Sequence, residues 1–446
     1  ANTTGDQNVA LGTEALKANT TAIHNTAIGY RAMYTHVTGN DNTAVGQEAL
    51  YTNNGGTGNT ALGRRALQLN TTAISNTAVG EQALKANTSG NWNTAVGQGA
   101  LSANQTGQLN VAIGVNAMTA VNTGSGHVAI GATALEDNTT GTVNVAVGAS
   151  ALAQNTTGSH NTALGHEAAK LQTTASNNVA IGEQTLYTNL TGTSNTAVGT
   201  GALYTNTASS NTAVGFEALV ANTQGEKNVA LGALSLDANL TGSKNTTIGY
   251  NTMSLSTTAA NNTAIGTSAG YNLSTGANNT LLGYDAGRSG SPGGTVTTGS
   301  NQMNLGDENI AAANIQVDWT VASDVRDKTD FTALDLGLDF VKALAPVTYK
   351  WDKRSKYGDK NAEDYDLNAQ TPDGTHKEDW LDIGFKAQEV EALEIAAGYD
   401  KDNKTNLVSS HTDDGKQMGL QYSKFVPILV KAIQELSTKN DALVAR

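Results

Sequence analysis

Several residue types that often mark a particular class of protein are absent from this chain or rare in it. None of its 446 residues is cysteine, only four are proline, and aromatic residues make up 5 %. The absence of cysteine excludes disulfides and thiolate metal sites, and it leaves the redox compartment undetermined. No apolar run approaches the roughly 18 residues of a membrane-spanning helix, and no signal-peptide pattern is present. We therefore expect no membrane insertion.

Charged side chains are scarce and unevenly distributed. They form 15 % of the chain, with a formal net charge of −13. Residues 1–305 carry 13 acidic and 9 basic side chains, whereas residues 306–446 carry 26 acidic and 17 basic ones. An acidic chain without a stripe of lysine and arginine is a poor candidate for binding nucleic acid. The charge distribution instead predicts two parts of different character.

The first part consists of about eighteen copies of one short sequence repeat. The residue before each repeat glycine is Val, Ile or Leu, and four residues before it stands Asn, with His127 and Gln302 as exceptions. The glycines recur every seventeen residues at Gly12, Gly29, Gly46, Gly63 and onward to Gly283. A fixed period of this length is typical of a solenoid, in which each unit closes its core only by stacking on its neighbours.

Each unit predicts a short strand followed by turns, as in the copy that runs from Asn42 to Leu50. Thr43 and Val45 have period-two spacing and should share one face of the strand, with Ala44 on the other. Leu50 adds a second apolar anchor, so the aliphatic residues are expected to build the core. Equivalent asparagines should stack as hydrogen-bonded ladders between turns.

Two other interpretations of the repeat are weaker. A disordered Asn/Thr/Gly-rich linker has no reason to keep an aliphatic residue at one phase. A helical repeat is disfavoured by the threonine and glycine content. The period shortens to 16 between Gly199 and Gly215, which indicates a trimmed loop. It widens between Gly283 and Gly306, which indicates a surface loop or the end of the regular rod.

These units resemble the Asn-x-Ala-x-Gly repeats in the head domains of trimeric autotransporter adhesins and in some phage tail fibres. The resemblance covers residues 1–306 and implies a parallel β-solenoid or β-roll, trimeric, stiff and extracellular. Tyrosines at variable positions could form glycan-stacking patches or simply lie on loop surface: Tyr30, Tyr51, Tyr187, Tyr204 and Tyr250.

The second part is expected to be an α+β domain over residues 323–446, joined by a connector strand within residues 307–322. Alternation over 317–321 and 347–351 predicts strands, and apolar spacing over 334–344 predicts a helix. Residues 353–379 are polar and read as a loop. Residues 422–446 predict an amphipathic helix, packed either on its own domain or against copies of itself.

Four motifs follow one another in this part. They are Ser323-Asp324-x-Arg326-x-Lys328, Leu344-Ala345-Pro346-Val347-x-Tyr349-x-Trp351, Ile383-Gly384-Phe385-x-Ala387-Gln388-Glu389-Val390 and Leu429-Val430-x-Ala432-Ile433-Gln434-Glu435-Leu436. This order resembles the self-cleaving intramolecular chaperone at the C-terminus of endosialidases and other phage tail fibres and spikes. The resemblance implies a domain that trimerises, guides folding of the fibre and is then cut off before the motif serine.

Carried onto this chain, the resemblance places the scissile bond between Ala322 and Ser323, with Ser323 as nucleophile and Lys328 as its partner. A lysine amine can act as the base where burial or nearby cations favour its neutral form. Five residues apart, the two side chains need a turn or a neighbouring subunit to meet. Asp324 and Arg326 read as structural partners. On local sequence alone, Ser323 also fits an ordinary helix N-cap.

No cofactor or metal site is expected. Asp400-x-Asp402-x-Lys404 begins like a calcium loop, but it has Lys at the fifth position and lacks the glycine at the sixth. The sequence predicts a homotrimeric phage tail fibre of the virion that binds a host cell-surface receptor and other virion tail proteins. Its only enzymatic activity would be a single-turnover Ser-Lys self-cleavage. The alternatives are a bacterial trimeric surface adhesin and a carbohydrate-depolymerising tail spike, although acidic residues in the repeats are sparse for the latter.

Overall fold

The computed structural model describes every residue except 1, 311, 315–320, 360, 361, 363, 400–406, 413 and 446. The chain forms two compact units, Ala1–Thr280 and Leu281–Arg446. Of the expected connector strand within 307–322, residues 311 and 315–320 lie outside the described residues, and the described ones form no strand. The expected strand at 317–321, apart from Val321, and the calcium-like segment from Asp400 to Lys404 also lie outside the described residues. Each unit is described separately below.

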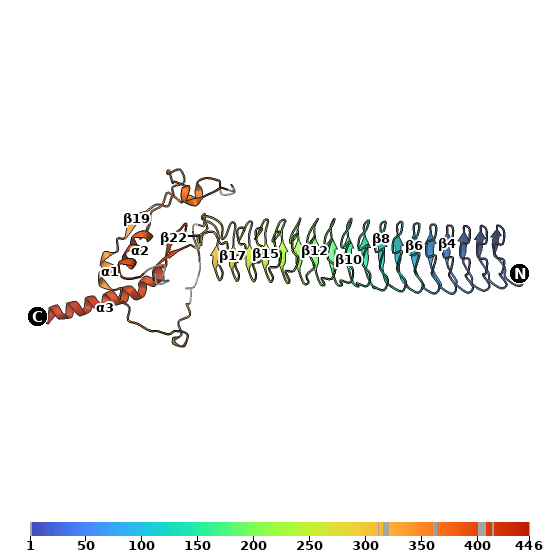
Figure 1. Cartoon of the computed structure of the whole chain (residues 1–446), viewed down its shortest axis with the longest axis horizontal. Coiled ribbons are helices and arrows are strands. Elements are labelled where there is room, and N and C mark those ends of the chain that lie inside the picture. The colour runs from blue at the N-terminus through green and yellow to red at the C-terminus, as the bar shows by residue number, and fades with distance from the viewer. Residues whose placement is uncertain are drawn as a thin grey trace. The chain divides into compact units, whose positions relative to one another are not determined.

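The repeats form a parallel β-solenoid, as the sequence predicts (Figure 1). Each turn contributes one three-residue strand that pairs in register with the turns on either side, for example Ala27 with Ala44. The strands are β1 (Val9–Leu11), β2 (Thr26–Ile28), β3 (Thr43–Val45), β4 (Thr60–Leu62), β5 (Thr77–Val79), β6 (Thr94–Val96), β7 (Val111–Ile113), β8 (Val128–Ile130), β9 (Val145–Val147), β10 (Thr162–Leu164), β11 (Val179–Ile181), β12 (Thr196–Val198), β13 (Thr212–Val214), β14 (Val229–Leu231), β15 (Thr246–Ile248), β16 (Thr263–Ile265), β17 (Thr280–Leu282) and β18 (Met303–Leu305).

The strands bury the face opposite to the one expected to build the core. The central alanine is fully buried in almost every turn, whereas the aliphatic residue before the glycine points outward, with 47 % of Leu62 and 38 % of Ile113 exposed. The expectation that this aliphatic residue anchors the core was wrong. In most turns the leucine or methionine four residues after the glycine is the large buried side chain, and it leaves room for a small residue, usually alanine, on the facing strand.

The repeat glycine is required where the chain leaves the strand. Gly46 has a φ of 136°, and a Cβ there would lie 2.6 Å from the carbonyl oxygen of Gly63 in the next turn. Further along the turn, Glu48 and Leu50 also have positive φ, at 57° and 49°. Non-glycine residues rarely adopt this region. Here the conformation recurs in nearly every turn because it directs the leucine inward while Leu50 N–H donates to Ala66 O at 3.0 Å.

Two buried columns, made mostly of polar side chains, connect successive turns of the solenoid and confirm the predicted ladders. In the first asparagine column, Asn59 donates its backbone N–H to Asn42 Oδ1 at 2.9 Å and its Nδ2 to Ala73 O at 2.9 Å. That column consists of Asn25, Asn42, Asn59, Asn76, Asn93, Asn110, His127, Asn144, Asn161, Asn178, Asn195, Asn211, Asn228, Asn245, Asn262 and Asn279.

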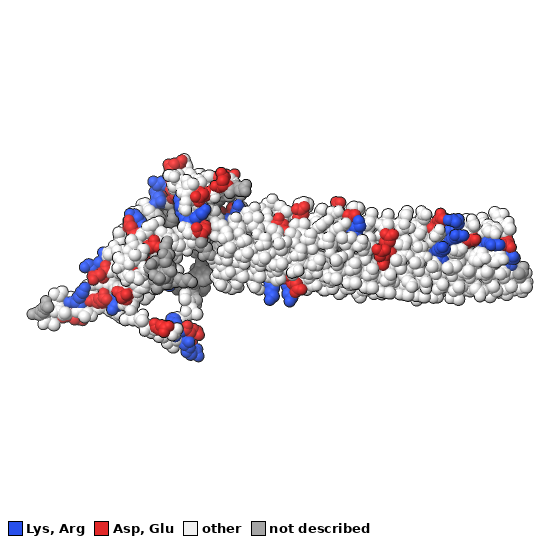
Figure 2. Space-filling view, in the orientation of Figure 1, with Lys and Arg blue, Asp and Glu red and all other residues white. Residues whose placement is uncertain are grey.

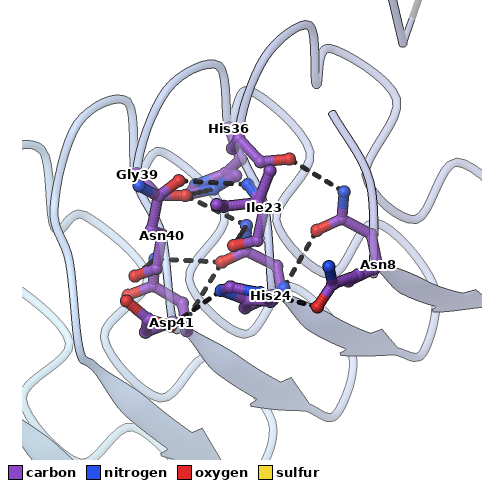
Figure 3. Close-up of polar contacts among 11 residues, drawn as sticks. Asn8, Ile23, His24, His36, Gly39, Asn40 and Asp41 are labelled. Atoms are coloured by element: carbon purple, nitrogen blue, oxygen red, sulfur yellow. Dashed lines mark hydrogen bonds and ion pairs between the residues drawn. The ribbon is translucent and has the colours of Figure 1, made fainter. Parts of the chain in front are cut away.

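The second asparagine column is less regular. Asn70 Nδ2 donates to Asn53 Oδ1 at 2.8 Å, and His36 takes an asparagine position with its Nε2 2.6 Å from Gly39 O (Figure 3). The column consists of Asn19, His36, Asn53, Asn70, Asn87, Asn104, Val121, Asn138, Asn155, Gln172, Asn189, Asn206, Asn222, Asn239, Ser256 and Leu273. Both columns satisfy backbone groups inside the turns, which is why asparagine recurs at two fixed phases.

The two irregular repeats do not interrupt the stacking. In the 16-residue repeat the backbone N–H of Asn211 still donates to Asn195 Oδ1 at 2.9 Å, so the missing residue is absorbed between Asn206 and Ala208. After the longer interval, Gly306 N–H donates to Leu282 O at 2.7 Å. The first irregularity is thus a trimmed loop, as expected.

The second unit has a small α+β core, as expected. Leu336, Phe340, Val390, Val408, Phe425 and Ile428 are buried together. The described elements are η1 (Val325–Asp327), α1 (Leu338–Ala343), β19 (Val347–Tyr349), η2 (Arg354–Lys356), η3 (Leu367–Ala369), β20 (Asp382–Gly384), α2 (Ala387–Ala396), β21 (Ser409–His411), β22 (Met418–Leu420), η5 (Tyr422–Lys424) and α3 (Phe425–Val444).

The sequence predicted several of these elements. The expected strand over 347–351 is β19, which pairs antiparallel with β20, and the expected helix over 334–344 is the shorter α1. The expected terminal helix over 422–446 begins as the turn η5 and continues as α3. Within the described residues, we find no helix with the length and apolar character needed to span a bilayer.

Candidate functional site

The structure brings Ser323 and Lys328 into contact within one chain. Lys328 Nζ donates to Ser323 Oγ at 2.5 Å. The single 3-10 turn η1 lies between them and folds the chain back on itself, so five residues of separation no longer place the side chains on opposite sides. Of the two routes considered from the sequence, a turn is therefore sufficient for the contact, and a neighbouring subunit is not required.

Asp324 and Arg326 hold this turn. Asp324 is the N-cap residue of η1: its Oδ1 accepts the backbone N–H of Arg326 at 2.9 Å. The Arg326 guanidinium also forms an ion pair with Asp324 Oδ2 at 2.6 Å and lowers the pKa of that carboxyl. Capping is thus done by Asp324, and the alternative that Ser323 is the N-cap does not hold. The Ser323 hydroxyl instead accepts a hydrogen bond from Lys328.

The pair is open to solvent in the single chain. Ser323, Lys328 and the flanking Ala322 are all exposed, as are the other residues of η1. A general base that works by proton transfer gains from a sheltered site in which its neutral form is favoured. The described part of one chain does not supply that shelter, so any cover must come from elsewhere.

The terminal helix α3 has two apolar sides, of which one is buried and the other is exposed. Phe425, Ile428 and Ala432 are buried in the domain core. On the same helix, Ile433 is 66 % exposed, and other large apolar side chains are also exposed: Val426, Leu429, Val430, Leu436 and Leu443. Helix α3 therefore docks on its own domain, and it also retains an apolar surface of the kind that packs against further helices.

Glu394 is a buried charge that the sequence pattern does not reveal. It lies on α2, fully buried, and its carboxylate accepts the backbone N–H groups of Leu407, Val408 and Ser409 at 2.8, 2.7 and 2.9 Å. The Ser409 hydroxyl donates to it as well. Its role is to fix β21 against α2. The described residues contain no group of three or more His, Asp or Glu side chains placed to hold a metal ion.

Comparison with known proteins gives one finding on this part of the chain. Curated proteins yield no match. A family model described as the chaperone of endosialidase matches residues 323–399, beginning at the serine that contacts Lys328. Residues 323–399 are thus similar to the chaperone of endosialidase, and together with the parallel β-solenoid this match fits a tail fibre with a C-terminal chaperone domain.

Proposed function

We propose that this protein is a homotrimeric tail fibre of a virion, extracellular and involved in host attachment together with other tail proteins. Its C-terminal domain would align and trimerise the chains and then cut itself off between Ala322 and Ser323. The observation that carries the proposal is the Lys328–Ser323 contact at the first residues of a segment that matches the chaperone of endosialidase.

The repeats explain why such a chaperone is needed. Neighbouring turns present nearly the same surface, with Thr, Ala and an aliphatic residue at matching positions, as in β2 and β3. Three chains displaced by one turn would therefore pair almost as well as three aligned chains. A domain without repeats removes this ambiguity and raises the local concentration of the partners.

Two apolar surfaces support a trimer. The first is the aliphatic stripe, formed by the outward residues before the repeat glycines; its exposed members include Leu62, Val96, Ile113, Ile130, Leu164, Leu231, Ile248 and Ile265. No strand of the repeats carries a charged residue, as expected for the centre of an interface. The second is the exposed side of α3. Copies of the chain would cover both surfaces.

The protein groups that react in the proposed cleavage all belong to η1 and its flanks. Ser323 Oγ attacks the carbonyl carbon of Ala322 while the neutral Lys328 amine takes the hydroxyl proton. A C–O bond forms, the Ala322–Ser323 C–N bond breaks, and the proton passes to the freed amino group of Ser323. Water then hydrolyses the ester, which leaves a carboxylate on Ala322 and restores the Ser323 hydroxyl. Burial of the turn in the trimer would favour the neutral amine and so couple cleavage to assembly.

A denaturing gel with intact mass analysis tests the proposal. The wild-type chain should yield fragments 1–322 and 323–446, whereas Ser323→Ala and Lys328→Ala should each give the full-length chain. Arg326→Gln, which weakens the turn but keeps both reacting groups, should cleave more slowly. Full-length chains in all four samples would rule out self-cleavage.

A further inference from the structure

One surface arrangement occurs twice on the rod. The first tyrosine cluster consists of Glu14, Lys17, Arg31, Tyr34 and Tyr51. The second tyrosine cluster consists of Glu167, Lys170, Gln184, Tyr187 and Tyr204. In each, one lysine and two tyrosines occupy the same position, five residues after the repeat glycine, in three successive turns. The clusters are separated by nine turns, which is roughly 43 Å at the usual spacing between strands.

The contacts within the two clusters match. The ring centroids of Tyr34 and Tyr51 lie 5.1 Å apart, and those of Tyr187 and Tyr204 lie 5.0 Å apart, with nearly parallel planes in both pairs. Lys17 Nζ contacts Glu14 Oε1 at 2.7 Å. Lys170 Nζ contacts Glu167 Oε1 at the same distance.

The glutamate of each cluster is held from the following turn as well. Arg31 Nε donates to Glu14 Oε2 at 2.7 Å, and Gln184 Nε2 donates to Glu167 Oε2 at 2.9 Å. Each lysine also lies over the first tyrosine ring of its pair, 5.0 Å from the centroid of Tyr34 and 5.9 Å from that of Tyr187. The polar groups of both clusters are therefore fixed in position before any ligand arrives.

The solenoid does not depend on these residues for its stacking. The same position carries Ser102, Thr119 and Ala153 in other turns. Leu101 N–H still donates to Ala117 O at 3.0 Å there, the distance also found beside Tyr51 between Leu50 and Ala66. Aromatic residues are rare in this chain, so their concentration at equivalent sites points to a use beyond the fold.

The clusters and the aliphatic stripe occupy different positions of the repeat. The positions two and five residues after the repeat glycine carry many of the charged side chains of the rod, whereas the strands carry none. Figure 2 shows the charges of the rod gathered in separate patches with uncharged surface between them. Charged residues are depleted from the centre of protein interfaces. The clusters would therefore stay accessible when the stripe is covered by other copies of the chain.

We propose that the two tyrosine clusters are equivalent binding sites for saccharide units of a surface polysaccharide. This inference rests on the proposed function, because it names the class of host receptor. A sugar ring carries C–H groups on its faces and hydroxyls at its rim. Half-buried phenol rings beside a fixed carboxylate and ammonium offer apolar contact and hydrogen-bonding partners together.

The size and repetition of the clusters favour a polysaccharide over a protein. A specific protein interface covers about 800 Å² on each partner, whereas each cluster consists of five side chains spanning only three turns. A polymer with a repeating structure can engage both clusters on each of three chains. Simultaneous engagement strengthens overall binding without any new contact.

Binding of the trimer that assembles from the full-length chain to an array of purified bacterial capsular polysaccharides and lipopolysaccharide O-chains tests the inference. Tyr34→Ser/Tyr51→Ser and Tyr187→Ser/Tyr204→Ser should each weaken binding at least tenfold, and the combination should abolish it. Tyr250→Ser, which removes an exposed tyrosine outside the clusters, should leave binding unchanged. The milder pair Tyr34→Phe/Tyr51→Phe keeps the stacked rings and should weaken binding through loss of the hydroxyls alone.

The inference would be overturned if the wild-type trimer bound no polysaccharide, if the cluster variants bound as well as wild type, or if the cluster substitutions changed the melting temperature alone. Binding to a protein receptor that survives all cluster substitutions would also contradict it. Trimer formation and cleavage are measured on the same samples. A chain that neither trimerises nor cleaves would contradict the proposed function. Trimers that form but bind no polysaccharide would contradict only the proposed saccharide sites.

Discussion

Asn239 and Ser256 occupy successive positions of the second asparagine column, and neither Asn239 Oδ1 nor Ser256 Oγ finds a hydrogen-bond partner among the described residues. The preceding step of the ladder is intact, with Asn239 Nδ2 donating to Asn222 Oδ1 at 2.7 Å. Similar orphaned oxygens occur at Asn104 and Asn155, which precede Val121 and Gln172. The second column is therefore a set of short ladders, each ending where the next side chain does not donate to the asparagine oxygen.

Ser256→Asn should stabilise the solenoid. The new amide would donate to Asn239 Oδ1, and it would replace a buried hydroxyl that has no partner. Satisfying such groups contributes about 1 kcal/mol. Thermal unfolding of the variant should show a higher melting temperature. Ser256→Ala serves as the control, because it removes the hydroxyl without repairing the ladder and should change stability little. A melting temperature for Ser256→Asn below that of Ser256→Ala would contradict the ladder account.

His127 should make the solenoid sensitive to acid. Its Nε2 lies 2.8 Å from Gly141 O and carries the proton, while its Nδ1 accepts the backbone N–H of Asn144 at 3.1 Å. Because burial lowers the pKa of His127 from 6.5 to about 4, the unfolded chain binds the extra proton more readily between these values. Stability should be complete above about pH 6.5 and should decline as the pH falls towards 4, by up to about 3 kcal/mol from this group.

His127→Asn restores the residue that the first asparagine column carries elsewhere and should remove this contribution. The difference in melting temperature between wild type and variant, measured from pH 7 to pH 4, isolates it from the titration of carboxyl groups. Burial also lowers the pKa of His36, so His36→Asn should act in the same direction. Parallel curves for wild type and His127→Asn over this range would show that the ring is not held neutral.

Glu394→Gln should weaken the C-terminal domain. The carboxylate accepts four donors from residues 407–409, whereas a glutamine side chain has one oxygen and would point an N–H group at another donor. Loss of such bonds to a buried charge costs about 2–3 kcal/mol. Chemical unfolding of the domain measures this loss. Glu389→Gln, on the exposed side of α2, is the matched control and should have little effect. Equal stability of the two variants would contradict a positioning role for Glu394.

The sequence predicted the regular parts of the fold because repetition multiplies a weak local signal. One copy of Asn-Thr-Ala-Val-Gly says little, but eighteen copies fix the period, the strand position and the ladders. Which strand face is buried could not be deduced, because period-two spacing defines two faces without saying which lies inside. Leu50 and its equivalents decide this by filling the interior, so that only Ala44 and its equivalents fit opposite.

The sequence likewise indicated some residues of the candidate site and not others. The family resemblance indicated Ser323 and Lys328, but their spacing did not show how the two side chains meet. The structure shows that the η1 turn, capped by Asp324, brings them into contact. Glu394 carried no signal at all. Its partners lie 13 to 15 residues further along the chain and are backbone groups, which any sequence would supply.

The most direct test of the account compares the oligomeric state of the full-length Ser323→Ala chain, which the proposed cleavage leaves intact, with that of a chain ending at Asp318. Light scattering after refolding at equal concentration measures both. If the C-terminal domain aligns the repeats, the full-length protein should form a single trimeric species. The shortened chain should then give aggregates or a mixture of sizes. Uniform, stable trimers of the shortened chain would contradict the account, because the repeats would then contain all the information that assembly needs.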